Sequence, residues 1–158
     1  MIEVNEKLPS AQFQYFEGSE MKTVTTEELF AGKKVVMFAV PGAFTPTCSN
    51  AHLPGYVVKF DDFRAKGVDT VVCISVNDAF VMNAWGKANN AENLIMLADG
   101  AGDFTKAIGL EMETGIFGGV RSTRYAMLVE DGVVTHLNVE EPKKFEVSDA
   151  DTMLELLA

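Results

Sequence analysis

The chain is poor in residues that bind metals or form disulfides: it has two cysteines and two histidines among 158 residues. Cys48 and Cys73 are 25 positions apart, a spacing that fits neither a disulfide framework nor the paired cysteines of a zinc site. His52 and His136 are 84 positions apart, so we expect no metal. So few cysteines are typical of a reducing compartment, where an isolated cysteine is either a buried packing residue or a reactive thiol.

Positive charge is also scarce. Lys and Arg number 13 against 23 Asp and Glu, so the formal net charge is −10, and such a surface repels nucleic acid and anionic membranes. No apolar run approaches the roughly 18 residues that a spanning helix needs. The N-terminal MIEVNEKLPSAQ has no apolar core like that of a signal peptide. We therefore expect a cytoplasmic protein that binds neither nucleic acid nor membranes.

The remaining composition is that of a folded globular protein, with 47% hydrophobic and 23% charged residues. A chain of this length can bury a substantial hydrophobic core. It contains no repeat, low-complexity segment or linker. We therefore expect a single domain spanning residues 1–158.

Three short, continuously apolar stretches predict buried strands: KKVVMFAV (33–40), DTVVCISV (69–76) and NLIMLA (93–98). Runs of this kind indicate a central sheet that is covered on both faces. Near the end of the chain, Asp131-Gly132 between strand-like residues predicts a hairpin. The order of elements predicts an α/β fold with a mixed sheet, parallel where helices cross over and antiparallel at the hairpin.

Helix start signals lie between these strands. Thr25 with Glu28 fits a capping box ahead of a helix that ends at Gly32. Asp78 is expected to cap a second helix, and Ser148 a C-terminal helix.

The segment VPGAFTPTCSNAHLPGY (40–56) surrounds Cys48 with backbone-fixing residues. Thr45 is a good N-cap and Pro46 is favoured at the first helical position, which makes Cys48 the third helical residue. Backbone N–H groups in that turn lack helical partners, and the positive end of the helix dipole stabilises a thiolate. These features favour a reactive nucleophile over a cysteine that only packs in the core, because a packing residue needs no Pro-Gly and Thr-Pro to fix the backbone around it.

The same segment resembles the active site of peroxiredoxins, specifically of the peroxiredoxin-5 or type II subfamily. The family's pattern is Pro-x-x-x-Thr-x-x-Cys, matched here by Pro41, Thr45 and Cys48. The similarity continues through CISVNDAFVMNAWGKA, LADG and RSTRYAMLVEDGVV, and so covers nearly the whole chain. It implies a thioredoxin-like fold with peroxiredoxin insertions, which agrees with the predicted α/β order.

The resemblance also implies a thiol peroxidase that reduces hydrogen peroxide and alkyl hydroperoxides. Cys48 would attack one peroxide oxygen and become a sulfenic acid, while the Thr45 hydroxyl would hydrogen-bond both sulfur and peroxide. Pro41 would shield the sulfur from water, and the backbone N–H groups of Thr47 and Cys48 would complete the peroxide cradle. Arg124 matches the family's arginine, whose guanidinium suits the thiolate and the departing oxygen. No metal, haem or flavin cofactor is implied.

Two nearby residues are harder to assign. Arg121 lies three positions before Arg124, and in a strand this odd offset predicts the opposite face. His52, four positions after Cys48, fits either a Cys/His pair that activates a nucleophile or a hydrogen-bonded structural histidine. We expect the structural histidine, since the family does not use this residue as a base. Pro54 is then expected to kink or end the helix.

The sulfenic acid can be resolved in two ways. Cys73 is the second thiol of the chain, but its strand-like surroundings predict burial, so it would need local unfolding to reach Cys48. An external thiol, glutathione with glutaredoxin or else thioredoxin, is therefore expected to restore Cys48. Similarity to plant-like type II members favours glutaredoxin. Phe117, in the glycine-rich GIFGGVRSTR, belongs either to a mobile loop or to the homodimer contact that the resemblance implies.

Two other activities remain open on the same fold. A deglutathionylating thiol–disulfide oxidoreductase usually has Cys-x-x-Cys, whereas Thr45 occupies the first position of that motif here. A redox sensor would pass oxidation from Cys48 to a partner without rapid turnover. The rate at which peroxide oxidises Cys48 separates a peroxidase from a sensor.

Overall fold

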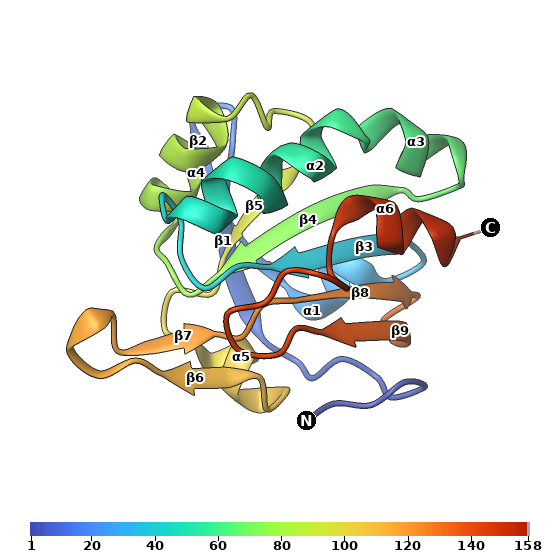
Figure 1. Ribbon diagram of the computed structural model, residues 1–158. Helices are drawn as coiled ribbons and strands as arrows, with labels where there is room; N and C mark the ends of the chain where they lie inside the picture. Colours follow the sequence, from blue (N-terminus) through green and yellow to red (C-terminus); the bar gives the residue numbers. More distant parts are fainter. Residues whose placement is uncertain (158) are drawn as a thin grey trace.

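Figure 1 shows the computed structural model of the chain, in which residues 1–157 are described. Its centre is a seven-stranded sheet in the order β2-β1-β5-β4-β3-β8-β9. These strands are β1 (Gln12–Glu17), β2 (Glu20–Thr25), β3 (Lys34–Ala39), β4 (Thr70–Ser75), β5 (Ile95–Ala98), β8 (Tyr125–Glu130) and β9 (Val133–Val139). A separate ribbon pairs β6 (Glu111–Glu113) with β7 (Val120–Ser122).

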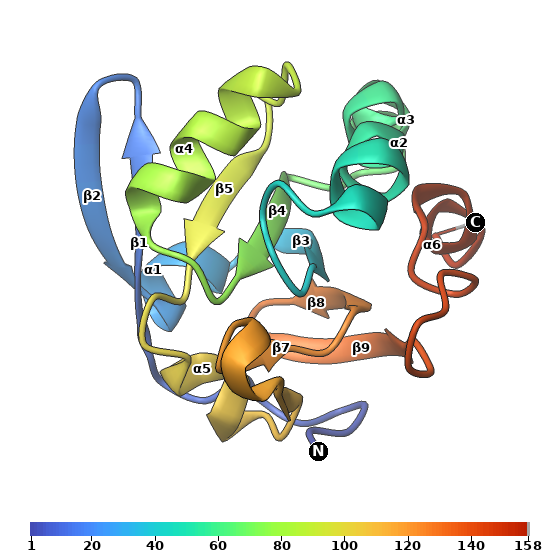
Figure 2. The same cartoon turned by 60° about the vertical axis from the view of Figure 1, so that its left-hand side comes forward.

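Helices cover both faces of the sheet (Figures 1 and 2). One face carries α2 (Leu53–Val58), α3 (Phe60–Ala65), α4 (Ala79–Ala88) and α6 (Ala150–Glu155). The other carries α1 (Thr26–Phe30) and α5 (Asp103–Ala107). A π-helical turn, η1 (Cys48–His52), leads into α2, and a 3-10 turn, η2 (Gly115–Phe117), joins β6 to β7. No helix within residues 1–157 is both long and apolar enough to cross a membrane.

The three apolar runs form β3, β4 and β5, which lie side by side and parallel at the centre of the sheet. Alternation along β3 sends Val36 and Phe38 into the core beneath α2, α3 and α4, and Val35 and Met37 into the core beneath α1 and α5. Both faces are therefore buried, which is why these strands have no polar face. With β8 antiparallel to β3, the mixed α/β sheet predicted from the sequence is confirmed.

Two of the predicted helix starts are confirmed. The Thr25 hydroxyl accepts the Glu28 N–H, and the Glu28 carboxylate accepts the Thr25 N–H, which is the reciprocal capping box. Asp78 accepts the Val81 N–H at the start of α4.

The prediction that Ser148 caps the C-terminal helix is wrong. Asp149 is the cap, and its carboxylate accepts the Thr152 N–H at 3.2 Å. The Ser148 hydroxyl and N–H instead donate to Glu140 Oε2 at 2.7 and 2.8 Å. Ser148 is therefore bound to the carboxylate of Glu140, eight residues earlier, and its hydroxyl does not cap the helix.

The helix that contains Cys48 does not end at Pro54. Helical backbone runs from Pro46 to Val58 and widens into the π turn, where the Leu53 N–H bonds to the Cys48 carbonyl. Proline has no N–H for an i→i−4 bond, and its ring crowds the carbonyl four residues earlier. A wider turn ahead of Pro54 gives that carbonyl room, so the helix continues without a break.

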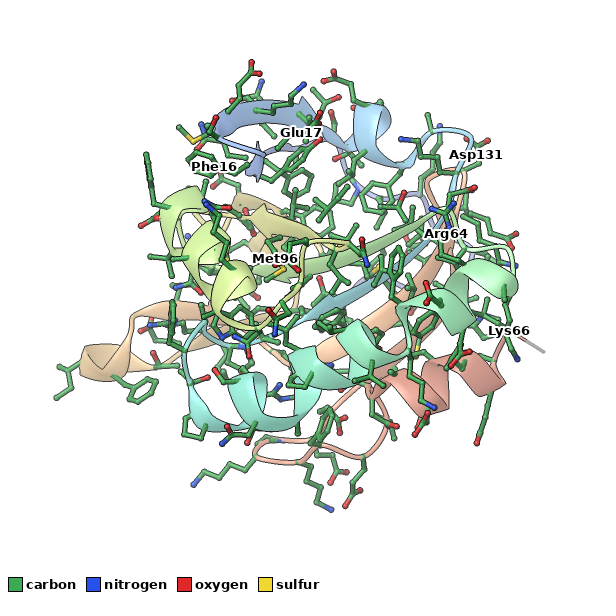
Figure 3. All side chains as sticks on the ribbon, turned by 90° about the horizontal axis from the view of Figure 1, so that it is seen from above. Phe16, Glu17, Arg64, Lys66, Met96 and Asp131 are labelled. Atoms are coloured by element: carbon green, nitrogen blue, oxygen red, sulfur yellow. The ribbon has the colours of Figure 1, made fainter. Side chains whose placement is uncertain are left out.

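Side-chain contacts hold α6 and α4 against neighbouring parts of the fold, and one of them reaches the turn that contains Cys48. Lys66 lies beside α6 (Figure 3), where its Nζ donates to the Leu154 carbonyl at 3.2 Å. Met96 of β5 lies against α4 (Figure 3), and Gly86 permits this approach because a Cβ there would come within 2.7 Å of Met96 Cγ. The adjacent Trp85 is fully buried, and its indole N–H donates to Ser49 Oγ at 2.9 Å.

The hairpin turn provides a test of backbone conformation alone. Asp131 and Gly132 have φ values of 49° and 77°, as the predicted tight turn requires, and no atom of residues 1–157 lies within 4 Å of a Cβ built on Gly132. Gly132→Ala should lower the free energy of unfolding by about 1–2 kcal/mol, measured by urea denaturation, because alanine is strained in the left-handed region. Gly100→Ala, outside that region, is the matched control. An equal loss in both variants would contradict this account.

Candidate active site

Cys48 is the third residue of the helical backbone that begins at Pro46, as the sequence predicts, and its side chain is 0% exposed. The first backbone hydrogen bond of this helix runs from Ser49 N–H to the Thr45 carbonyl at 2.9 Å. The N–H groups of Thr47 and Cys48 precede it, in the unbonded part of the first turn. The local dipoles therefore favour negative charge at this sulfur.

Arg124 provides a cation at the sulfur. It lies between β7 and β8, and its Nη2 donates to Cys48 Sγ at 3.1 Å. The guanidinium also lies over the ring of Phe145, with Cζ 5.8 Å from the ring centroid. Since arginine stays protonated in proteins, the sulfur faces a permanent positive charge as well as the helix end.

His52 binds the other side of the same guanidinium. Its Nδ1 lies 2.7 Å from Arg124 Nη1, and its Nε2 lies 3.0 Å from the Ser148 carbonyl oxygen. Arginine can only donate and a carbonyl can only accept, so Nδ1 is the acceptor and Nε2 carries the proton. Burial, with a smaller contribution from the charge of Arg124, lowers the pKa of His52 from 6.5 to about 3. The ring is neutral near pH 7, as a structural histidine in this position must be.

A buried carboxylate fixes the carbonyl to which His52 is bonded. Glu140 accepts the backbone N–H groups of Glu146, Val147 and Ser148 and the Ser148 hydroxyl, all at 2.7–2.9 Å. Burial alone would raise the pKa of Glu140, but these hydrogen bonds outweigh it and lower the pKa below the ordinary 4.5. Glu140 therefore anchors the loop that orients His52, and through it Arg124.

Arg121 also reaches the Cys48 loop, contrary to the prediction from strand alternation. Its Nη1 donates to the Pro41 carbonyl at 3.2 Å. Alternation fails because the chain leaves the strand conformation between Arg121 and Arg124. Gly42 makes room for this contact, since a Cβ there would come within 2.7 Å of Arg121 Nη1. Arg121 thus holds the backbone of the loop while Arg124 holds the sulfur.

The Thr45 hydroxyl makes a hydrogen bond within its own loop. It donates to the Gly42 carbonyl at 2.7 Å, so its single proton is already bound. Toward Cys48 and an incoming peroxide it therefore presents only oxygen lone pairs. A hydrogen bond between this oxygen and the sulfur stays a prediction, and a peroxide O–H can donate to the same oxygen.

Cys73 lies in the middle of β4, paired with Phe38 of β3 on one side and Met96 of β5 on the other. It is fully buried in the same hydrophobic core as Cys48, and both thiols are free. Burial, with a contribution from Cys48, raises the pKa of Cys73 well above its usual value. A neutral, buried thiol of this kind is a poor nucleophile.

An open pocket of about 630 Å³ lies beside the buried sulfur. Its lining includes Pro41, Thr47 and Arg124 from the surroundings of Cys48, and Phe117 from the turn η2. The volume is typical of a site for a small molecule. The pocket leads from the surface to the residues that enclose the sulfur.

Known proteins are similar to this chain in sequence and in fold. Residues 3–154 match the family model described as Redoxin. The chloroplastic Peroxiredoxin-2E-2 of Oryza sativa subsp. japonica is 50% identical over 165 residues, which cover 99% of this chain and 72% of the rice protein. Peroxiredoxin-2B of Arabidopsis thaliana is 45% identical over 159 residues, which cover 99% of this chain and 98% of that protein.

A solved structure is also similar to this chain. The crystal structure of reduced Prx3 in complex with H2O2 from Vibrio vulnificus is 60% identical to this chain, with a TM-score of 0.98 and 100% of each chain covered. The chain belongs to the type II peroxiredoxins. It therefore has the thioredoxin-like peroxiredoxin fold that the sequence predicts, and it is a thiol peroxidase.

The fold of this peroxiredoxin brings most of the predicted site residues together. Arg124 contacts the Cys48 sulfur, and Pro41 and Thr47 line the adjoining pocket. Thr45 lies at the start of the same helix, whereas Cys73 is held in the sheet.

The residues that position Arg124 cannot be predicted from the sequence. Glu140 and Phe145 carry no local sequence signal, and the local signal at Ser148 is that of a helix cap. Their roles depend on contacts between the loop before α6 and the turn η1, which no sequence spacing indicates.

Burial of His52 should make the free energy of unfolding depend on pH in the acidic range. Between pH 6.5 and about 3 the unfolded chain binds a proton at His52 that the folded chain excludes, so acidification favours unfolding. This group should lower the free energy of unfolding by about 1.4 kcal/mol per pH unit in that window. His52→Asn should remove that part of the slope, measured by urea denaturation at several pH values.

His136→Asn, on β9 and away from Arg124, is the reference for losing an imidazole elsewhere. Glu140, with its lowered pKa, loses stabilising charge in the same acidic direction, so the difference between variants is the relevant quantity. A slope unchanged by His52→Asn would mean that the folded protein protonates His52 as freely as the unfolded chain.

Proposed function

We propose that this peroxiredoxin reduces hydrogen peroxide and alkyl hydroperoxides through the thiolate of Cys48. The contact between Arg124 Nη2 and Cys48 Sγ at 3.1 Å carries the proposal. The thiolate attacks one peroxide oxygen, the O–O bond breaks, and the sulfur becomes a sulfenic acid. The departing oxygen leaves as hydroxide or alkoxide and takes up a proton, giving water or an alcohol. A guanidinium beside the sulfur stabilises the charge as it moves to that oxygen.

The neighbouring groups would hold the peroxide for in-line attack. Thr45 Oγ1, whose proton is bound to Gly42, accepts a hydrogen bond from the peroxide O–H. The N–H groups of Thr47 and Cys48 donate to the peroxide from the first helical turn. Pro41 shields the sulfur on the pocket side and adds no competing N–H. Fixing both oxygens in this way lowers the entropic part of the barrier.

We further propose that an external thiol reduces the sulfenic acid. Cys73 is hydrogen-bonded into the centre of the sheet and its pKa is raised, which argues against an intramolecular disulfide. Glutathione with glutaredoxin is the favoured reductant over thioredoxin, because the chain is similar to plant peroxiredoxin-2 proteins. Each turnover then consumes two external thiol groups: the first forms a mixed disulfide with Cys48 and releases water, and the second regenerates the thiolate.

The proposed oligomer is a homodimer. Ile116 and Phe117 are 109% and 77% exposed on the turn η2, at the end of the β6–β7 ribbon that projects from the sheet (Figure 1). Two adjacent, fully presented apolar side chains are suited to an interface. For the location we propose the cytoplasm, although the rice protein named above is chloroplastic.

Cysteine variants test the one-cysteine mechanism. Cys48→Ser should abolish hydroperoxide consumption, and Cys73→Ser should keep most of it, because the buried thiol takes no part in turnover. Consumption of hydrogen peroxide is followed with glutathione and glutaredoxin, and separately with thioredoxin, as the donor. If Cys73→Ser lost turnover while its circular dichroism spectrum stayed unchanged, the resolving thiol would be internal after all.

The arginine contact is tested by pre-steady-state oxidation. Trp85 is the single tryptophan and its indole bonds to Ser49, next to Cys48, so its fluorescence can report sulfur oxidation in a stopped-flow instrument. Arg124→Lys should slow oxidation by about 10²–10³-fold, since an ammonium cannot bind the sulfur and His52 with the same planar fork. An unmodified protein that reacts no faster than a free thiol would favour the redox sensor instead.

A further inference from the structure

Glu140 closes the loop that follows β9 into a ring. The residue comes directly after the strand and is only 5% exposed. Within residues 1–157, every hydrogen-bond donor to its carboxylate lies in residues 146–148. Oε2 alone accepts the N–H groups of all three residues and the Ser148 hydroxyl. The carboxylate therefore ties the end of the loop 140–148 to its beginning.

The charge of Glu140 does not by itself favour the reaction. Among the effects on the pKa of His52, that of Glu140 is upward, although burial and Arg124 outweigh it. By charge alone the carboxylate thus favours protonation of the imidazole that must stay neutral. For the same reason a carboxylate in this region disfavours a thiolate at Cys48. Any benefit of Glu140 to catalysis must therefore come from the geometry that it enforces.

That geometry reaches the imidazole of His52 from two sides. The Ser148 carbonyl lies 3.0 Å from His52 Nε2 and also accepts the Tyr56 hydroxyl at 2.7 Å. Phe145, in the same loop, packs against the imidazole with 4.9 Å between the ring centroids. The closed loop thus fixes the rotation of this ring.

Rotation of the imidazole and position of the guanidinium are linked. His52 Nδ1 lies 2.7 Å from Arg124 Nη1, and Nη2 of the same rigid plane bonds to Cys48 Sγ. A displacement at Nη1 is therefore transmitted to the nitrogen at the sulfur. Glu140 also holds the backbone at this point, because its N–H donates to the Arg124 carbonyl at 3.0 Å.

We propose that Glu140 is a positioning residue for the oxidation of Cys48: it closes the loop 140–148 and thereby sets, through His52, the orientation of the Arg124 guanidinium. This inference rests on the proposed peroxidase role of Cys48. Without the Glu140 carboxylate, Arg124 keeps its charge but loses its fixed place. The thiolate is then less stabilised, and the departing oxygen meets a poorly aligned donor.

Glu140→Ala tests the proposal in the reduced full-length protein. Oxidation by hydrogen peroxide is followed through Trp85 fluorescence over a series of pH values. The rate near neutral pH should fall about 10- to 100-fold, as for a catalytic group that is misplaced by about 1 Å. The pH at which the rate reaches half its maximum should rise by about one unit, because the thiolate is the reacting form.

The direction of that shift separates positioning from charge. Removal of a nearby negative charge would on its own favour the thiolate and lower the half-maximal pH. His52 and Cys73 do not confuse the measurement near neutral pH, since burial lowers the pKa of the first and raises the pKa of the second. A half-maximal pH that falls or stays unchanged in Glu140→Ala would overturn the inference.

Glu141→Ala is the matched control. Glu141 is the next residue and is exposed, and its carboxylate pairs with Lys144 at 3.3 Å instead of closing the loop. The variant loses the same charge and should leave the half-maximal pH unchanged or lower it. A rise as large as that of Glu140→Ala would show that the closed loop is not responsible.

A double-mutant cycle tests the route through His52. In a His52→Ala background the link to Arg124 is absent, so Glu140→Ala should slow oxidation further by only about twofold or less. A full additional loss would overturn the proposed route. If circular dichroism shows that Glu140→Ala does not fold, Glu140→Gln replaces it in every arm. This variant keeps one acceptor oxygen and should change the rate and the half-maximal pH in the same directions, by less.

Alkylation of Cys48 by iodoacetamide separates the two proposals, because it requires the thiolate but no peroxide. Its half-maximal pH should rise in Glu140→Ala as that of oxidation does. If the unmodified protein reacted with hydrogen peroxide no faster than a free thiol while alkylation still showed the shift, only the peroxidase role would be contradicted. Fast oxidation by peroxide with no shift in either reaction would contradict the role of Glu140 alone.

Discussion

The hydrogen bond from Arg124 to the buried sulfur of Cys48, 3.1 Å long, is the interaction on which the rest of the site depends. A negative charge on a buried atom is costly unless a positive group faces it. Here the helix end and a guanidinium meet at the same sulfur, so burial and ionisation become compatible. Burial also keeps bulk water and bulky reagents away, while the pocket beside Pro41 admits a peroxide.

A guanidinium can serve in this way only if its own position is fixed. His52 accepts its second N–H, the Ser148 carbonyl binds the opposite edge of the imidazole, and Glu140 holds the backbone around Ser148. These hydrogen bonds require a neutral His52, because a protonated imidazole would lose its acceptor nitrogen and repel Arg124. Burial provides that neutrality by depressing the pKa of the ring. The turn that contains His52, the loop around Ser148 and Glu140 thus together hold Arg124 at the sulfur.

Much of this architecture follows from local signals. The capping box at Thr25, the Asp131-Gly132 turn and the continuously apolar strands each depend on residues a few positions apart, so the sequence alone predicts them. The same holds for the spacing of Pro41, Thr45 and Cys48. Predictions failed where a distant group competed with a local one. Ser148 is bound by Glu140 rather than capping α6, and irregular backbone brings Arg121 to Pro41 instead of turning it away.

The sequence by itself determined the fold class and the buried central strands, and its resemblance to peroxiredoxins pointed to Cys48 as the candidate nucleophile and to Arg124 as its partner. Only the tertiary structure decided what holds that arginine, since the contacts span 72 residues from Arg124 to His52 and 96 residues from His52 to Ser148. Hydrogen bonds of this range depend on how the sheet places its loops, and side-chain periodicity carries no information about them. The orientation of the Thr45 hydroxyl and the lining of the pocket beside Cys48 likewise depend on three-dimensional packing.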